Sequence, residues 1–255
     1  MVFQFYALYP ALTVGQNIAM PLHSEGLSKA DSDARVMKVA TIMHLTEVLD
    51  RMPNQISEGE KQRLAVARAI VRDPNCFLFD EPLSRLDAEL RHSMRGQIKE
   101  VLTGLSKATV IVTHDQLEAL TMASRIAIMK DGVIEQVGTP HDVFAKPVNV
   151  FVASFIGSPP MNLLQQAPNT PAGRILGIRP EHMDITPTGW PLQVETVELL
   201  GAERLVHARL GTESLTLRLD ASLPAPATGE SFCITPRADK LHWFDAKTGQ
   251  RITTA

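Results

Sequence analysis

The chain has 255 residues, 44% of them hydrophobic and 21% charged, which suits one large or two modest globular domains. A formal net charge of −3 argues against direct nucleic-acid binding and against attachment to an anionic membrane surface, since both favour a basic protein. No apolar run approaches the roughly 18 residues of a transmembrane helix, the first residues lack the basic region of a signal peptide, and the two cysteines lie far apart. We therefore expect neither a membrane span nor a disulfide framework, and reduced cytosol is the favoured compartment.

Two helices are predicted in the first third of the chain. Residues 28–51 repeat apolar side chains at helical spacing, after a serine that can cap the first turn. A second helix should begin at Ser57, because Ser57 and Glu60 have the spacing of a capping box, and it should end before Pro74. His44 is interpreted as a packing or surface residue, and no metal ligands are predicted among the histidines.

A short apolar strand is predicted after the second helix. Residues 76–79 read Cys-Phe-Leu-Phe between Pro74 and Pro82, which predicts a central strand of a parallel sheet covered on both faces. Asp80 and Glu81 follow at the carboxyl end of this strand, where open α/β sheets bind ligands. An isolated Asp-Glu pair is most often a solvated strand end, so its role depends on the motifs around it.

A second apolar strand is predicted at residues 109–113, after a segment rich in helix formers at 88–105. His114 follows this strand directly. A lone histidine in such a place is usually structural, so neighbouring motifs again decide its interpretation. Asp115 and Glu118 then favour the start of another helix.

A β-hairpin is predicted next, because Asp131 and Gly132 form a favoured two-residue turn between the apolar runs of residues 124–137. Pro140 suits the first position of a helix, and residues 149–156 form a further apolar helical stretch.

The last third of the chain changes character. Proline, glycine and asparagine accumulate at residues 157–175, which predicts a domain boundary. Short apolar runs then alternate with glycines and a proline-rich segment, at 194–200, 204–210, 215–219 and 231–235. This spacing predicts a small β-barrel. The segment has neither a basic stripe nor a series of aromatic residues, so recognition of nucleic acid by base stacking is not expected.

Residues 56–87 resemble, in order and spacing, the signature helix, the Walker B strand and the D-loop of an ABC-type ATPase. Residues 1–18 resemble the Q-loop of that family and the segment after it, and His114 resembles its switch histidine. Gly-Ile-Arg-Pro-Glu-His at 177–182 resembles the start of the OB-like regulatory domain of sugar-importer ATPases. The resemblance covers essentially the whole chain.

The resemblance implies an α/β fold class with two parts. The first is an incomplete ABC-type, P-loop NTPase-like nucleotide-binding domain at residues 1–156. A linker at 157–175 separates it from a small all-β, OB-like (TOBE-type) regulatory domain at 176–255.

The resemblance also assigns roles in ATP hydrolysis. It makes Glu81 the general base that activates the attacking water, while His114 contacts the γ-phosphate and holds that water in line. Gln4 reaches Mg²⁺ and the same water, and Asp80 anchors the water shell of the ion. The implied cofactors are ATP and Mg²⁺. The signature and D-loop residues would face ATP held by the opposite subunit, namely Ser57, Gly59, Glu60 and Asp87.

Three further stretches, at 69–74, 151–164 and 241–252, are similar to ATPase subunits of bacterial sn-glycerol-3-phosphate importers. ATPases of maltose and oligosaccharide importers are the alternative. The resemblance implies two transmembrane permease subunits, a periplasmic or lipid-anchored solute-binding protein and a second ATPase subunit as partners, with no nucleic acid. It places the protein peripherally on the cytoplasmic face of the inner membrane.

One departure from the family concerns the phosphate-binding loop. None of the 15 glycines is followed by lysine, so the sequence holds no G-x-x-x-x-G-K-[ST] motif and is interpreted as N-terminally truncated. Residues 1–255 alone are therefore expected neither to bind ATP at micromolar levels nor to hydrolyse it, since loss of this loop would weaken ATP binding by roughly 4 kcal/mol. A truncated, catalytically inactive relative is the alternative function. A stand-alone OB-type binding module is not compatible with the set of ATPase motifs.

Two other departures change charge. The signature reads Ile-Ser-Glu-Gly-Glu where the family has Leu-Ser-Gly-Gly-Gln, and Arg85 stands where the D-loop usually has asparagine. Glu58 is expected to weaken ATP-driven closure by like-charge repulsion, whereas Glu60 either faces the ligand or caps its own helix. No effect of Arg85 follows from the sequence.

Overall fold

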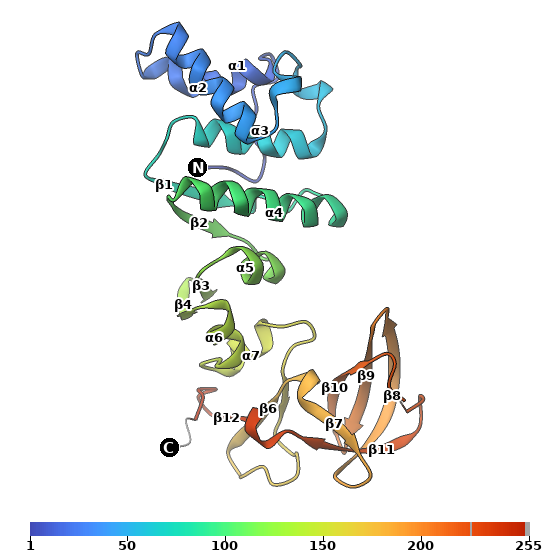
Figure 1. Ribbon diagram of the computed structural model, residues 1–255. Coiled ribbons are helices and arrows are strands. Elements are labelled where there is room, and N and C mark those ends of the chain that lie inside the picture. Colours follow the sequence, from blue (N-terminus) through green and yellow to red (C-terminus); the bar gives the residue numbers. More distant parts are fainter. Residues whose placement is uncertain (225, 253–255) are drawn as a thin grey trace. The chain divides into compact units, whose positions relative to one another are not determined.

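The computed structural model describes residues 1–224 and 226–252. The chain divides into two compact units, an N-terminal unit of residues 1–123 and a C-terminal unit that begins at Ser124, and each is described by itself (Figure 1). The predicted domain limits at residues 156 and 175 stay predictions.

The N-terminal unit is mainly helical. Its elements in chain order are α1 (Val14–Ala19), η1 (Met20–Ser24), α2 (Lys29–Ile42), η2 (Thr46–Val48), η3 (Pro53–Gln55), α3 (Glu58–Ile70), β1 (Cys76–Asp80), α4 (Ala88–Leu105), β2 (Ala108–Val112) and α5 (Gln116–Met122). The predicted capping box of α3 is confirmed. The Ser57 hydroxyl accepts a bond from the Glu60 amide, and the Glu60 carboxylate accepts one from the Ser57 amide at 2.7 Å.

The helical region predicted at 28–51 is divided in two. α2 ends at Ile42, and His44 adopts a left-handed backbone with φ of 51°. The Leu45 amide then reaches back to the Ala40 carbonyl at 2.8 Å, which satisfies a carbonyl that the end of the helix leaves open. Because this turn buries Met43 and Leu45 in the core, packing decides where the helix ends.

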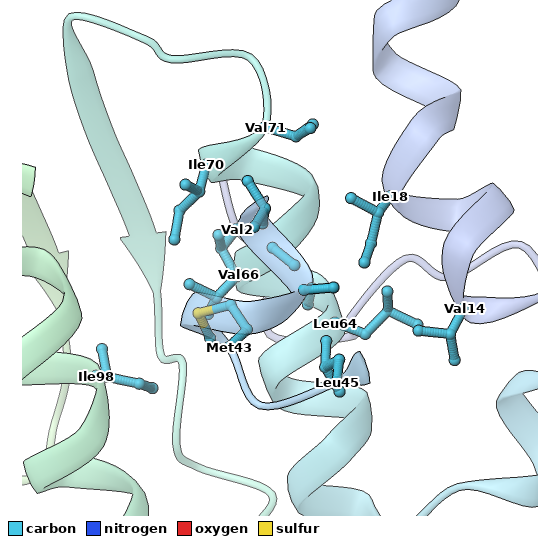
Figure 2. Close-up of a cluster of buried hydrophobic side chains, with 14 of the residues drawn as sticks. Val2, Val14, Ile18, Met43, Leu45, Leu64, Val66, Ile70, Val71 and Ile98 are labelled. Carbon is cyan, nitrogen blue, oxygen red and sulfur yellow. The ribbon is translucent and has the colours of Figure 1, made fainter. Parts of the chain in front are cut away.

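β1 and β2 form a two-stranded parallel sheet, and Val2 pairs with Phe79 of β1 on the other side. Phe77 and Phe79 are buried in the core of the N-terminal unit, which Figure 2 shows around residues such as Val2. The expectation that β1 is covered on both faces is wrong. Leu78 is 45% exposed, and the side chains of the neighbouring strand on that face, Val110 and Val112, are also exposed, because no described element packs against them.

The C-terminal unit begins with the predicted hairpin, β3 (Ile126–Lys130) and β4 (Val133–Gly138). Asp131 and Gly132 both have positive φ, as a turn of this type requires. Two short helices follow, α6 (Pro140–Ala145) and α7 (Val150–Phe155).

The rest of the unit is built on β-strands, as predicted, with two short 3₁₀ turns between them, η4 (Pro180–His182) and η5 (Ala238–Lys240). A five-stranded antiparallel sheet has the order β10-β9-β8-β11-β7, and a three-stranded sheet has the order β12-β6-β5. The strands are β5 (Asn162–Leu164), β6 (Arg174–Ile178), β7 (Met183–Thr186), β8 (Trp190–Leu200), β9 (Glu203–Leu210), β10 (Glu213–Asp220), β11 (Ser231–Pro236) and β12 (His242–Asp245). Residues of both sheets share one hydrophobic core.

A buried arginine, Arg179, holds the segment that joins α7 to the sheets by hydrogen bonds to backbone carbonyls. The guanidinium of Arg179, only 2% exposed, donates to the carbonyls of Phe144, at 2.8 Å, and Ile156. Burial lowers the pKa of Arg179 to about 10. Gly157 lies so close that a Cβ atom there would stand 2.7 Å from this guanidinium. The contacts tie the ends of α6 and α7 to the residue that follows β6.

Candidate functional site

Glu81 lies at the carboxyl end of the parallel strand pair, directly after β1. Its amide donates to the Val112 carbonyl of β2 at 2.8 Å, so the residue is fixed to both strands. Its φ of 45° lies in the left-handed region, which is unfavourable for a residue with a side chain. Backbone strain of this kind concentrates at functional sites, where the surrounding structure holds it.

Gln4 reaches the same point from the start of the chain. Val2 donates to the Leu78 carbonyl at 2.8 Å and accepts from the Asp80 amide at 3.0 Å, which aligns the first residues with β1. The Gln4 side chain then donates through Nε2 to Glu81 Oε2 at 3.1 Å. The sequence-predicted pair is therefore brought together across 77 positions of the chain.

His114 contacts the other oxygen of the same carboxylate. It follows β2, and its Nδ1 lies 2.9 Å from Glu81 Oε1. Because a carboxylate accepts and does not donate, Nδ1 carries the proton in this bond. The hydrogen bond to Glu81 and the negative charge of Glu81 raise the pKa of His114 above its usual value. The imidazole itself remains largely exposed, with 72% of its side-chain surface open.

The position of His114 depends on helix α5 and on its packing against α4. Asp115 caps α5 by accepting from the amide of Leu117 at 2.8 Å. Its other carboxylate oxygen lies 3.5 Å from Arg91 and 3.6 Å from Arg95, two arginines of α4. The ion pairs join the two helices directly beside the histidine.

Taken together, the two donors hold Glu81 from both sides. A carboxylate with an amide on one oxygen and an imidazole on the other has a fixed orientation and can accept a proton from a water placed beside it. The sequence did not reveal the contribution of Ser84. Its hydroxyl accepts from Gln4 Nε2 at 3.3 Å and donates to the Glu81 carbonyl at 3.0 Å. Its place three residues after Glu81, in a tight turn, is the only sequence signal for it.

The start of α3 is arranged differently from these residues. Ser57 is exposed and Gly59 is buried. The Glu60 carboxylate is turned toward Ser57, whose hydroxyl and amide lower the pKa of Glu60. Of the two orientations expected for Glu60, the structure has the one that caps the helix.

Asp80 and Asp87 complete the set of predicted site residues. Asp80 is the last residue of β1, is half-buried and directly precedes Glu81 in the chain. Asp87 caps α4 by accepting from the Leu90 amide at 2.9 Å.

The residues around Asp80 fit Mg²⁺ only if water and a nucleotide supply most of its ligands. Within the described ranges no group of three or more His, Cys, Asp or Glu side chains could enclose an ion, so there is no dedicated metal cage. Mg²⁺ is commonly held by one or two carboxylates together with water and the phosphates of a nucleotide. A single half-buried carboxylate at a strand end, with the Gln4 amide close to Glu81, suits that kind of site.

Known protein families match segments of both units. A family profile described as "ABC transporter" matches residues 1–84, and one described as "TOBE domain" matches residues 176–244. Among solved structures, a dimeric ATP-binding cassette in a post-hydrolysis state, bound to ADP and Pi, is 31% identical. It matches with a TM-score of 0.47 over 55% of this chain and 61% of that one.

Three relatives are named "sn-glycerol-3-phosphate import ATP-binding protein UgpC". The protein of Bordetella avium is 45% identical and the match covers 99% of this chain and 77% of the relative. The proteins of Cereibacter sphaeroides and Escherichia coli K12 are 46% and 44% identical, each over 99% of this chain and 78% of the relative. The predicted fold class, an ABC-type nucleotide-binding part followed by an all-β TOBE-type part, is confirmed. At this level of identity over nearly its whole length, the chain belongs to the family of ABC transporter ATP-binding proteins.

Proposed function

We propose that the chain is the ATP-binding subunit of an ABC importer for sn-glycerol-3-phosphate or a related carbohydrate, and that it couples ATP hydrolysis to uptake. The shared name of the relatives supports the substrate class. The observation that carries the proposal is the pair of contacts to Glu81, 3.1 Å from Gln4 and 2.9 Å from His114.

In the proposed reaction Glu81 is the general base. Its carboxylate takes a proton from a water molecule, the water oxygen bonds to the γ-phosphorus of ATP, and the bond from that phosphorus to the β–γ bridging oxygen breaks. ADP leaves with the bonding electron pair, and inorganic phosphate is the second product. Gln4 and the Nδ1 of His114 orient Glu81 for this step. A proton on the other ring nitrogen of His114, Nε2, would stabilise negative charge on the γ-phosphate.

Mg²⁺ would be held by Asp80 and Gln4, together with water and the nucleotide. When bound, the ion neutralises charge on the phosphate oxygens. Within the described residues, the site has groups for orienting the water, for acting as the base and for holding the ion. It contains no glycine-rich phosphate loop of the G-x-x-x-x-G-K type.

The start of α3 is proposed to face ATP bound to an opposite subunit in a two-fold dimer. A helix N-terminus presents amide hydrogens and the positive end of the helix dipole, both of which suit a phosphate. Ser57, Gly59 and Glu60 lie in this first turn, and Asp87 at the start of α4 is placed in the same interface by the resemblance. Glu60 would act through the cap it forms with Ser57.

Membrane association is proposed to occur through partners, on the cytoplasmic face of the inner membrane. No helix in the described part of the chain is both long enough and apolar enough to cross a bilayer. A cavity of about 470 Å³ adjoins the segment after Gln4, and Tyr6, Ala7 and Arg68 are among the residues that line it. We assign this cavity to the permease subunits, and assign recognition of the solute to a separate binding protein.

The test is to reconstitute the chain in proteoliposomes with the permease subunits and binding protein of an sn-glycerol-3-phosphate importer. Because residues 1–255 hold no phosphate loop, the chain is tested with a segment that carries a G-x-x-x-x-G-K-[ST] loop joined ahead of residue 1. We expect ATP turnover that sn-glycerol-3-phosphate stimulates and maltose does not. Glu81→Gln should lower turnover at least about 100-fold, since it removes the base. Glu89→Gln, at an exposed position of α4, is the matched control and should change little. Equal, background-level turnover in all three proteins would instead identify a catalytically inactive relative.

A further inference from the structure

Glu81 and His114 belong to two different loops, so their contact depends on how those loops are held together. Glu81 begins the loop after β1, which runs to Leu86, and His114 lies in the loop after β2. His114 Nδ1 is 2.9 Å from Glu81 Oε1, yet 72% of the histidine side-chain surface is exposed. Packing around the ring therefore does not fix this contact, and the contacts of the two loops must do so.

Arg91 of α4 contacts both loops. Its Nη2 donates to the Leu86 carbonyl at 2.9 Å, at the end of the loop after β1. Its Nη1 lies 3.5 Å from Oδ2 of Asp115, the residue after His114. Both nitrogens belong to one planar guanidinium with donors in a fixed geometry, so the group can hold two acceptors at a set spacing. We call this pair of contacts, to Leu86 and to Asp115, the Arg91 clasp.

Asp115 passes this restraint on to the histidine. Its Oδ1 accepts from the amides of Leu117, at 2.8 Å, and Glu118, at 3.2 Å, and so caps α5. Its own amide donates to the Thr113 hydroxyl at 3.0 Å. Because Thr113 and Asp115 flank His114, this bond closes a tight turn around the histidine. A shift of Asp115 would therefore move the imidazole.

Arg95, one helical turn further along α4, provides a comparison with Arg91. Its Nη2 lies 3.6 Å from the same Asp115 Oδ2, so the two arginines place similar charge beside this carboxylate. The contact from Arg95 joins α5 to α4. The guanidinium of Arg91 also holds the Leu86 carbonyl, and through it the loop that begins with Glu81.

We propose that Arg91 is a positioning residue that holds the loop after β1 to the loop after β2, so that His114 Nδ1 stays on Glu81. The consequence for catalysis rests on the proposed function, in which Glu81 is the general base. Arg91 would then orient the base through His114, without contacting water or nucleotide itself.

The test measures which ring nitrogen of His114 carries the proton in the neutral imidazole, from its ¹⁵N NMR signals in the purified chain without nucleotide. The bond to Glu81 requires this proton on Nδ1. We expect Arg91→Gln to move most of the population to the form protonated on Nε2. Arg91→Lys should do nearly the same, because a single ammonium replaces the planar fork. Arg35→Gln removes an ion-paired arginine of α2 and is the matched control, which should leave the tautomer unchanged.

The pKa of His114 separates positioning from a simple effect of charge. This pKa is raised chiefly by the hydrogen bond and the charge of Glu81, and the charges of Glu118 and Asp115 raise it further. Removing an arginine from Asp115 would by itself raise the pKa of His114, because the carboxylate is then less neutralised, whereas losing the bond to Glu81 would lower it. We expect Arg91→Gln to lower this pKa. A rise would overturn the inference.

Arg95→Gln decides whether the contact to Leu86 matters. It removes the same charge from Asp115 and keeps the Arg91 clasp, so the proton should stay on His114 Nδ1. If Arg95→Gln changes the tautomer as much as Arg91→Gln does, or if neither changes it, the inference is wrong.

A turnover assay separates failure of the clasp from failure of the proposed function. In the reconstituted protein with a phosphate loop, Arg91→Gln should lower kcat about tenfold and leave the KM for ATP nearly unchanged, since it acts on the base and not on the nucleotide. A change of tautomer without loss of turnover would support the clasp and count against Glu81 as the general base.

Discussion

Strand β10 of the C-terminal unit and strand β2 of the N-terminal unit both carry regularly spaced apolar residues, but they are buried to different extents. Leu215, Leu217 and Leu219 of β10 are at most 8% exposed, because the second sheet covers that face. Val110 and Val112 of β2 are 53% and 58% exposed. The C-terminal unit thus closes its own core, whereas the unit that carries the candidate site leaves one face of its parallel sheet open.

The difference shows how each kind of sheet is completed. In an antiparallel sheet, hairpins bring the covering strands from nearby in sequence, and one solvated face is normal. Strands of parallel sheets are apolar on both faces and need cover from both sides. The candidate site nevertheless forms, because Gln4, Glu81 and His114 are fixed by backbone pairing along β1 and β2 and do not depend on the open face.

The largest effect should come from the core of the N-terminal unit. Phe79 is 1% exposed, and Phe79→Ala should cost about 3–5 kcal/mol of the free energy of unfolding of this unit. Both tryptophans, Trp190 and Trp243, lie in the C-terminal unit, so their fluorescence in urea reports that unit alone. Far-UV circular dichroism, dominated by α2, α3 and α4, reports the other.

We expect Phe79→Ala to move the circular dichroism transition and leave the tryptophan transition in place. Phe244→Ala, at a fully buried position of β12, is the matched control and should do the reverse. A common shift of both signals in either variant would contradict the view that the two cores are separate.

The next effect is confined to the C-terminal unit and depends on pH. His242 is 9% exposed, and burial, together with the charges of Arg251 and Arg179, lowers its pKa to about 4. Between about pH 6.5 and 4 the unfolded chain binds a proton at His242 that the folded chain does not. The free energy of unfolding should therefore fall as the pH falls through this range, by at most about 3 kcal/mol.

Urea unfolding followed by tryptophan fluorescence at pH 7, 5.5 and 4.5 measures this loss. His242→Gln should flatten the pH dependence, leaving a smaller slope from His182, whose pKa is also lowered by burial. His141→Gln, at an exposed position of the same unit, is the control and should keep the full slope. An unchanged slope in His242→Gln would show that the histidine is protonated in the folded unit.

A smaller effect separates two roles of Asp87. Asp87→Ala removes the cap of α4 and should lower the free energy of unfolding of the N-terminal unit by about 1 kcal/mol. Asp87→Asn keeps an oxygen that can accept from the Leu90 amide, so its stability should be nearly unchanged. If both variants destabilise the unit equally, the charge of Asp87 matters and not its cap.

The sequence predicted best what depends on neighbouring residues. The capping box of Ser57 and Glu60 and the turn at Asp131 and Gly132 are set by contacts within three residues, and both are confirmed. The break after Ile42 was missed, because it results from burying Met43 and Leu45 in a core that helical spacing does not describe.

Long-range contacts could be predicted only through the family resemblance. It named Gln4, Glu81 and His114, and the structure brings these three side chains together. It gave no indication of Ser84, nor of the Phe5 ring beneath Arg85, because these contacts join loops about 80 residues apart. The sequence does not predict the exposure of Leu78 either. A strand that is apolar on both faces has the same sequence pattern whether or not both faces are covered.

The smallest change in stability is expected on the open face itself. Val110 is 53% exposed, so Val110→Lys should alter the free energy of unfolding by no more than about 0.5 kcal/mol. β2 is the outer strand of the described sheet, and a charge on an exposed strand hinders edge-to-edge association. The variant should therefore stay soluble at higher concentration than the unchanged chain, as measured by light scattering. Ile111→Lys, one position along and packed against the core, should instead destabilise the unit strongly. If Val110→Lys destabilises the unit as much as Ile111→Lys does, this face of the sheet is covered and the contrast between the two units is wrong.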